Sequence, residues 1–553
     1  MDPGANVGND YHLNVQNRER SDSAASPHTQ TLVNNQVLLS QSTNTQVVSV
    51  EELQEQHRLA QKQKVDKLLG ENSQESLPSN LSSLGRDQRP SQSSTGSDPK
   101  EHFLSSDFGS SLIIQPNGSV KGGTLPALVE RLTTHEHTDL KFSKTFLMTY
   151  TSFATAGEVF DLLIHRFHLL APEGLSESDI TMWREKKQMV VQLRVINVMK
   201  SWLEHHFDDT RDDYILSRIR QFADSDIPMT IVGPVRYLKK IVERRESKGG
   251  LEPKRIITAQ NFPPQPILPK NSKKLKLLDI DPLEMARQLT IIESYTFNRI
   301  KPDECLNKNW SGPEHLKTHK AHNIRTMIQL SNRLAAWVTH SILGMKDDVK
   351  KRASMIKWFI YVAERCRSLN NFSTMAGIIA GINSPPIRRL KRTWDQVSQK
   401  ALNIHQSLDT TIDSTKNFAN YKQLLRNINP PCVPFLGVYL TYLTFITDGN
   451  PDFLKDAERG GQQLTSPPGG GPGSLPLVNF AKRQMAADLI SEIQQYQATP
   501  YNFTPIPQIS KFVTQQLEES DHAPDAFPIS LRIEPREKDD EKMARMLSES
   551  GFF

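Results

Sequence analysis

Residues 327–338 read MIQLSNRLAAWV, and their large apolar side chains recur at the spacing of an α-helix. Met327, Leu330, Leu334 and Trp337 fall three or four residues apart, so a helix places them on one face. Other stretches repeat the pattern: Leu125, Leu128, Val129 and Leu132; Val191, Val195, Val198 and Trp202; Ile356, Phe359, Ile360 and Ala363; and Met485, Leu489, Ile493 and Tyr496. Strands do not alternate with crossover helices along the sequence, so the pattern predicts an all-α fold rather than a Rossmann fold or a barrel.

Composition divides the chain into five segments. Residues 1–105 are rich in Ser, Gln, Asn and Asp, which predicts a disordered polar region. Residues 106–246 are predicted to form a first helical domain, which also contains a short strand expected at Leu112–Ile114. Residues 275–517 are predicted to form a second helical domain. Glycines and prolines mark 247–274 as a linker. Residues 518–553 are charged and predict a flexible tail.

Charge and cysteine content exclude several classes of function. The net charge is only +5, and no stripe of basic residues interleaved with aromatics is seen, so we expect no nucleic-acid partner. The three cysteines form no CxxC pair, which predicts neither a disulfide framework nor a zinc site, and we expect no metal or cofactor. The odd number and wide spacing of the cysteines predict a reducing, cytoplasmic setting. The longest apolar run, about 432–446, is too short to span a bilayer. We expect no obligate oligomer.

A basic cluster lies near the end of the first helical block. It consists of Lys239, Lys240, Arg244, Arg245 and Lys248. A solvated helix end is the plainer interpretation. The alternative is contact with anionic lipid, which would recruit the protein to the plasma membrane.

The sequence contains no recognisable motif for covalent chemistry. The glycine-rich run PPGGGPGSLP at 467–476 lacks the Lys-Ser/Thr that closes a phosphate-binding loop. Neither HExxH nor GxSxG is present. These absences disfavour an enzyme of small-molecule metabolism and favour a protein that acts by binding.

Two residues at predicted helix ends in the second block invite a functional as well as a structural interpretation. Asn383 precedes Ser-Pro-Pro, and Asp448 begins the turn Asp-Gly-Asn-Pro after an apolar helix. An aspartate at a helix C-terminus opposes the helix dipole at a cost of about 0.3–1 kcal/mol. Good turn chemistry is the simpler explanation of Asp448, and helix capping is the simpler explanation of Asn383.

Three stretches together resemble the catalytic domain of Ras-type guanine-nucleotide exchange factors, the Son-of-sevenless class. They are LDIDPLEMARQLT at 278–290, NPPCVPFLG at 429–437 and VNFAKR at 478–483. The segment 120–245, which contains GGTL at 122–125, resembles the Ras exchanger motif that precedes that domain. The resemblance implies helical domains throughout and non-covalent exchange of nucleotide on a Ras-family small GTPase.

The mechanism implied by the resemblance is a helical hairpin that opens the GTPase's nucleotide site. Its helices would be Phe435–Thr447 and Leu477–Gln497. Asp448 matches the family's acidic residue, whereas Thr444 replaces a larger apolar residue one turn earlier. A Pro/Gly insertion at about 458–476 also departs from the family pattern.

The resemblance further implies a set of GTPase contacts. Together with Asp448, Thr444 and Asn383, they are Trp310, Asn323, Gln329, Asn417, Phe418, Tyr421, Phe435, Thr441, Lys482 and Arg483. Core packing remains the alternative for Trp310, Phe418 and Tyr421, and a solvated helix face for Lys482 and Arg483. A Rap- or Ral-type GTPase as the partner, or a helical scaffold without exchange activity, also remains open.

Overall fold

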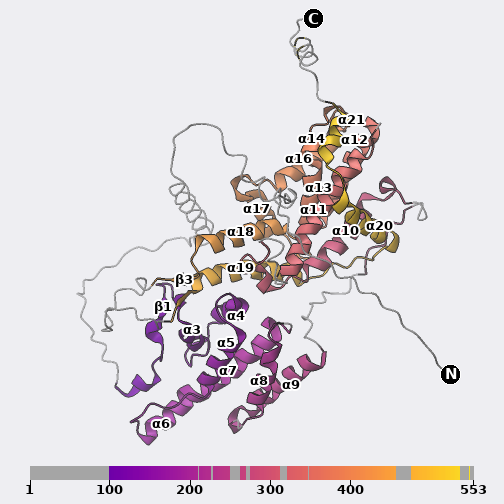
Figure 1. Ribbon diagram of the computed structural model, residues 1–553. Helices are drawn as coiled ribbons and strands as arrows, with labels where there is room; N and C mark the ends of the chain where they lie inside the picture. Colours follow the sequence, from indigo (N-terminus) through magenta and orange to yellow (C-terminus); the bar gives the residue numbers. More distant parts are fainter. Residues whose placement is uncertain are drawn as a thin grey trace, which may run out of the picture. The chain divides into compact units, whose positions relative to one another are not determined.

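The computed structural model describes residues 99–209, 211–225, 228–248, 262–269, 275–311, 321–346, 348–455 and 475–535, together with Met543 and Leu547. All of them lie in a single unit of the chain, Lys64–Phe553. Helices dominate the described residues (Figure 1), which confirms the predicted all-α class. Most of the predicted disordered region, linker and Pro/Gly insertion lies outside the described residues, as does the end of the predicted C-terminal tail apart from Met543 and Leu547.

The N-terminal block folds around one apolar core that includes Leu128, Phe146, Val195 and Trp202. Its α5 begins with a capping box, in which Thr155 Oγ1 accepts from the amide of Glu158 and the Glu158 carboxylate accepts from the amide of Thr155. The elements are β1 (Leu112–Ile114), β2 (Val120–Gly123), α3 (Leu125–Leu132), α4 (Leu140–Thr149), α5 (Ala156–Phe167), α6 (Glu177–Trp183), α7 (Met189–Ser201), α8 (Asp213–Ala223) and α9 (Val232–Lys248).

Ordered structure begins before the predicted boundary at residue 106. Pro99–Leu104 form a 3-10 helix, and Phe103 is buried. The buried Lys187 donates to the carbonyl of Ser105 at 2.6 Å, and the buried Glu130 accepts from the Ser106 hydroxyl at 2.7 Å. The prediction that residues 99–105 are disordered is therefore wrong. A buried charged group such as Lys187 needs hydrogen-bond partners, and the carbonyl of Ser105 is one of them.

The C-terminal block packs its longest helices closely together. Gly381 lets α13 approach α11, since a Cβ atom there would lie 2.6 Å from the carbonyl oxygen of Ala335. The buried face predicted at 327–338 is present, with Leu334 and Trp337 in the core. The helices are α10 (Pro282–Phe297), α11 (His322–Leu343), α12 (Val349–Ser368), α13 (Phe372–Ile382), α14 (Pro385–Arg388), α15 (Lys391–Trp394), α16 (Gln399–Thr411), α17 (Ala419–Arg426), α18 (Leu436–Gly449), α19 (Phe480–Gln497), α20 (Pro507–Glu519) and α21 (Ala526–Ile533).

The predicted flexible tail is folded over its first part. Helix α21 and the buried Glu534 pack on the C-terminal block. The Glu534 carboxylate accepts from the backbone amides of Arg392 and Thr393, both at 3.1 Å, and from the Thr393 hydroxyl at 2.8 Å. Residues 518–534 thus belong to the domain, and a charged composition misled the prediction because the carboxylate is used at the N-terminus of α15.

We expect Glu534→Gln to lower the free energy of unfolding by about 1–3 kcal/mol. The substitution replaces one acceptor oxygen of the carboxylate with an NH₂ group, which cannot accept a hydrogen bond. At least one buried donor of Arg392 or Thr393 then lacks an acceptor. Urea unfolding of the full chain measures the change. The exposed Glu519 on α20 offers a matched control, and Glu519→Gln should stay within about 0.5 kcal/mol of wild type. Equal stability of the two variants would show that the carboxylate does not hold α21.

A small sheet connects the N-terminal block to the second block. Its strand order is β1-β2-β4-β3, where β3 is Phe453–Leu454 and β4 is Leu477–Asn479. Strands β2 and β4 pair antiparallel, with Gly123 opposite Val478. Gly122 must be a glycine, because a Cβ atom there would lie 2.5 Å from the carbonyl oxygen of Val478. The second hairpin helix therefore begins at Phe480, and Leu477–Asn479, predicted as helix, form a strand.

The described part of the linker and the basic cluster have structural roles. Residues 262–269 run along α10, where the amide of Ile267 donates to Glu284 at 2.9 Å. In the basic cluster, Arg245 is buried and donates to both carboxylate oxygens of Asp209, and Lys239 pairs with Asp224. These ion pairs leave less of the cluster for a lipid contact than the sequence indicated. Across the described residues, every helix is too short or too polar to cross a membrane.

Candidate functional site

Helices α18 and α19 lie side by side and form a hairpin (Figure 1). One face of α18 packs Leu443 and Tyr439 into an apolar cluster that also contains Ile490 and Ile493 of α19. A different face carries Thr441, Thr444 and Asp448, which are spaced three and four residues apart. The hairpin predicted from the sequence is present, and three of its candidate functional residues, Thr441, Thr444 and Asp448, form one stripe.

The hydroxyl groups of this stripe bond within their own helix. Thr444 Oγ1 donates to the carbonyl of Leu440, and Thr441 Oγ1 to the carbonyl of Gly437, each at 2.8 Å. Both threonines are half-buried, whereas Asp448, in the last turn of α18, is exposed. The stripe therefore offers a small, smooth surface that ends in a single carboxylate.

Lysine side chains surround the C-terminal end of α18. Lys308 Nζ donates to Asp448 Oδ1 at 2.5 Å. Lys482 Nζ donates to the carbonyls of Thr447 and Asn450 at 2.9 and 2.7 Å. A lysine at this position stabilises the negative end of the helix dipole, which offsets the unfavourable placement of Asp448.

Lys482 and Arg483 are buried rather than presented at the surface. Both pair with Asp452, at 3.0 and 2.8 Å, and Arg483 also lies over the ring of Phe153 in the N-terminal block. Burial lowers the pKa of Lys482, although Asp452 opposes that shift. Burial would raise the pKa of Asp452, but its hydrogen bonds from Arg483 and Lys482 outweigh burial and lower it. The structure therefore contradicts the interpretation of these residues as a solvated helix face, because their ion pairs with Asp452 hold α19 to the segment that follows α18. Contact with the GTPase stays a prediction for both residues.

A strained turn lies at the base of α18. Lys416, Asn417 and Phe418 have φ values of 51°, 58° and 58°, a left-handed conformation that non-glycine residues adopt only when their surroundings hold them. The hydroxyl of Tyr442 donates to Asn417 Oδ1 at 3.1 Å. Such strain is common at ligand-binding sites, so Asn417 remains a candidate contact.

The aromatic residues near this turn form a supporting cluster. Phe418 and Tyr421 are buried, and the hydroxyl of Tyr421 accepts from the amide of Phe435 at 2.7 Å. The rings of Phe418 and Phe435 meet edge to face at 6.4 Å. The structure therefore places Tyr421 and Phe418 in the core instead of at the surface, and their role is to position the half-buried Phe435 where α18 begins.

Three predicted contacts lie around the N-terminal part of α11. Asn323 donates to Glu304 at 2.7 Å and to the carbonyl of Arg299 at 2.9 Å. Trp310 is half-buried against the apolar cluster of the hairpin, and Gln329 is exposed on α11. Of these, Gln329 and the exposed part of Trp310 are open to a partner, whereas the Asn323 amide is occupied within the chain.

Asn383 ends α13 and joins it to α16. Its Nδ2 donates to Asp409 at 2.8 Å, and its Oδ1 lies 3.0 Å from Nε2 of His405. Burial lowers the pKa of His405, which favours a neutral ring that donates to Asn383. Asn383 is therefore half-buried and oriented by two residues of α16, in addition to its position at the helix end.

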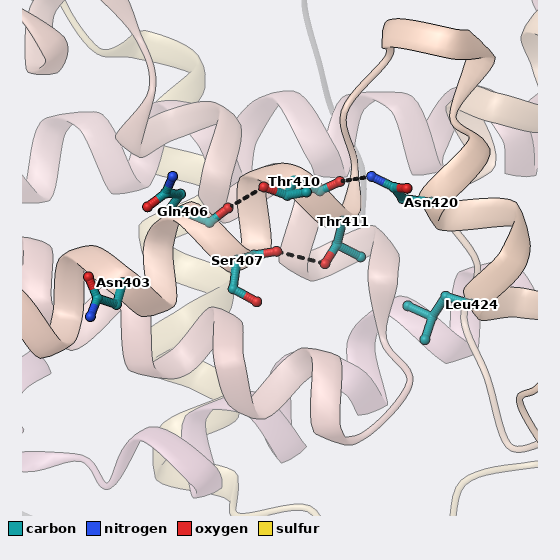
Figure 2. Close-up of a pocket in the computed structure, with 7 residues that line it drawn as sticks. All are labelled: Asn403, Gln406, Ser407, Thr410, Thr411, Asn420 and Leu424. Carbon is teal, nitrogen blue, oxygen red and sulfur yellow. Dashed lines mark hydrogen bonds between the residues drawn. The ribbon is translucent and has the colours of Figure 1, made fainter.

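An open hollow of about 510 Å³ lies between α16 and α17 (Figure 2). Asn420 Nδ2 donates to the carbonyl of Thr410 at 3.2 Å across it. Its lining residues are Asn403, Gln406, Ser407, Thr410, Thr411, Asn420 and Leu424. None of these side chains titrates near neutral pH, so the hollow offers hydrogen bonds but no acid, base or nucleophile activated by one. Within the described residues, no cluster of His, Cys, Asp and Glu is placed to hold a metal ion.

Comparison with known proteins identifies both blocks. The RasGEF domain model matches residues 284–484, and the RasGEF N-terminal motif matches 119–222. Cell division control protein 25 of Saccharomyces cerevisiae is 35% identical over 473 residues, which cover 81% of this chain and 29% of that protein. Ras guanine nucleotide exchange factor A of Dictyostelium discoideum is 36% identical over 404 residues, covering 72% of this chain and 62% of that protein. The chain belongs to the family of Ras-type guanine-nucleotide exchange factors.

The chain spans 29% and 62% of the length of these two relatives. A further relative, Ras guanine nucleotide exchange factor J of Dictyostelium discoideum, is 34% identical over 430 residues, or 76% of this chain and 49% of that protein. The two matched models occur in the order expected from the sequence. The resemblance stated from sequence motifs is therefore confirmed at the level of the family.

The sequence did not reveal three residues of the candidate site. Lys308 pairs with Asp448, Asp452 holds Lys482 and Arg483, and Tyr442 holds Asn417. Each of them contacts a partner that is distant in sequence. The separation is 140 residues for Lys308–Asp448, 31 residues for Asp452–Arg483 and 25 residues for Tyr442–Asn417. The only local signal is Asn307 before Lys308, since asparagine favours a left-handed turn.

A buried carboxyl group supports the entry to α18. Glu293 of α10 is buried and accepts from the Ser373 hydroxyl at 2.6 Å, and the neighbouring Phe372 amide donates to the carbonyl of Val433 at 2.9 Å. Burial raises the pKa of Glu293 to about 7. The pKa of Glu293 is therefore higher in the folded protein than in the unfolded chain. The protonated Glu293 side chain contributes fully to the free energy of unfolding below about pH 4.5, and this contribution is lost as the pH rises through about 7.

We therefore expect Glu293→Gln to stabilise the protein at pH 8.5. Glutamine keeps an acceptor for Ser373 and removes the buried charge, which destabilises the wild type by on the order of 3 kcal/mol at about 1.4 kcal/mol per pKa unit. The advantage over wild type should shrink by on the order of 2 kcal/mol at pH 5. Urea unfolding at both pH values measures it, with the exposed Glu518→Gln as control. An advantage that does not change with pH would contradict this account of Glu293.

Proposed function

We propose that this chain is a guanine-nucleotide exchange factor that releases GDP from a Ras-family small GTPase by inserting the α18–α19 hairpin at the nucleotide site. Both matched family models and the names of the relatives support the proposal. The observation that carries it is the stripe of Thr441, Thr444 and Asp448, which leaves a carboxylate exposed at the end of a helix whose other face is buried.

Exchange of this kind is a linkage between two ligands. The exchange factor binds the nucleotide-free GTPase better than the loaded form, and reciprocity makes nucleotide bind the complex correspondingly more weakly. Each factor of ten in release requires about 1.4 kcal/mol of differential binding. No bond is made or broken, so the residues of the site need only shape and charge.

Individual residues take different parts in this mechanism. Asp448 supplies a negative charge toward the cationic groups of the GTPase's nucleotide site. Thr444 and Thr441 supply a narrow contact surface beside it, and Gln329, Trp310 and Asn417 extend the contact. Asn383 is presented by His405 and Asp409. Thr444 is too small to fill a magnesium site, so we assign displacement of the ion to charge and not to bulk.

The cellular setting is part of the same proposal. We place the activity in the cytoplasm with recruitment to the plasma membrane, and we propose a monomer as the active form. Arg245 and Lys239 contribute little to recruitment in this view, because Asp209 and Asp224 already pair with them.

Release of fluorescent GDP from purified Ras-, Rap- and Ral-type GTPases tests the function. The full chain should accelerate release from a Ras-type GTPase. Acceleration of a Rap- or Ral-type GTPase alone would replace the proposed partner. Binding to a nucleotide-free GTPase without acceleration of any of the three would indicate a scaffold instead.

A further inference from the structure

A strained turn brings a lysine to the end of α18. The turn follows the 3-10 helix Pro302–Cys305, and Asn307 and Lys308 both have left-handed backbone, with φ values of 51° and 53°. The amide of Ser311 donates to the carbonyl of Lys308 at 2.8 Å, and Arg325 donates to the carbonyl of Asn309 at 2.7 Å. Two consecutive non-glycine residues hold this conformation only because the surrounding contacts fix it.

The turn directs Lys308 to Asp448. The Nζ–Oδ1 distance is 2.5 Å, and the side chains of Lys308 and Asp448 are 32% and 42% exposed. An ion pair with this exposure is stabilised only weakly, because water screens both charges. The pair can therefore open when another cation approaches the carboxylate.

Lys482 is a different kind of neighbour. It is 4% exposed, its Nζ donates to the carbonyls at the end of α18, and it pairs with Asp452. These contacts fix Lys482 as part of the structure. Lys308, in contrast, contacts the Asp448 carboxylate itself, at a surface that a partner can reach.

We infer that Lys308 is an internal counter-ion that competes with the GTPase for Asp448. The inference rests on the proposed function, in which Asp448 contacts a cationic group of the opened GTPase. In the free exchange factor, Lys308 holds the carboxylate. In the complex, the pair opens, so the fraction of molecules with a closed pair reduces the affinity for the opened GTPase. Lys308 thus sets how readily Asp448 is available.

Removing Lys308 should accelerate nucleotide release. We expect Lys308→Met to increase single-turnover release of fluorescent GDP by about twofold to fivefold, the range that exposed ion pairs of this kind produce. Lys308→Arg keeps the charge and should release nucleotide at the wild-type rate. Lys351→Met removes a lysine of α12 from another exposed ion pair, with the N-cap residue Asp348, and should leave the rate unchanged.

The Asp448→Asn background decides whether the effect runs through the carboxylate. There, Lys308→Met should have no effect on release. Slower release by Lys308→Met, or equal acceleration with and without the Asp448 charge, would overturn this inference alone. A normal rate for Asp448→Asn by itself would overturn the proposed role of Asp448 and this inference together. Thermal melts of each variant exclude unfolding as the cause.

Discussion

Replacing Asp448 with asparagine is expected to slow nucleotide release from the GTPase by about tenfold to a hundredfold. A hydrogen bond to a charged group contributes about 1.5–3 kcal/mol, and about 1.4 kcal/mol corresponds to a factor of ten. Asparagine preserves the turn after α18 and removes only the charge. The measurement is single-turnover release of fluorescent GDP by the wild type and by Asp448→Asn.

Stability should change little in the same variant. The charge of Asp448 opposes the dipole of α18, so its loss gains up to about 1 kcal/mol. Loss of the exposed pair with Lys308 costs about 0–1 kcal/mol and offsets that gain. A matched control is Asp521→Asn, because Asp521 also forms an exposed ion pair, with Arg333 of α11. Normal release by Asp448→Asn would mean that Asp448 serves only to form the turn after α18. The mechanism would then be restricted to steric insertion of the hairpin.

The apolar pattern of the sequence was sufficient to predict the helices and the class of fold. Leu334, Trp337, Val195 and Trp202 are buried as their spacing indicated, because a helix must bury its apolar face whatever its partners are. Family motifs added the hairpin and the position of Asp448. Both kinds of information are local in sequence.

Charged side chains with distant partners could not be predicted in this way. Lys482 and Arg483 occur where a solvated helix face is the usual interpretation, yet Asp452 and the N-terminal block bury them. Glu534 occurs in a charged segment, yet it accepts from the amides of Arg392 and Thr393 in α15. Burial of a charge depends on a compensating partner, and that partner is set by the tertiary fold.

The joint between the N-terminal block and the hairpin supports the second large effect. Phe480, the first residue of α19, is 2% exposed and belongs to the apolar core of the N-terminal block. Its ring stacks on Phe142 of α4 at 4.5 Å, and Thr145 donates to Gln484 at 2.8 Å beside it. Strand β4 immediately before it pairs with β2. The orientation of α19 is therefore fixed from its N-terminal end by the other block.

We expect Phe480→Ala to lower the free energy of unfolding by about 3–5 kcal/mol, because it empties a fully packed aromatic site. Phe359→Ala is the matched control, since Phe359 is buried against Trp337 in the core of the second block, away from this joint. Urea unfolding should show similar losses for the two variants. Nucleotide release should separate them.

At a temperature where both variants remain folded, Phe480→Ala should slow nucleotide release at least about tenfold more than Phe359→Ala does. Misplacing an active group by about 1 Å can cost a factor of about 10², and Phe480 anchors the helix that supports α18. Phe480→Leu keeps most of the apolar volume and should show the same ordering with a smaller loss, which covers the case in which the alanine variant unfolds. Equal release by Phe480→Ala and Phe359→Ala would mean that α19 keeps its orientation without the N-terminal block, and the small sheet would then contribute only to stability.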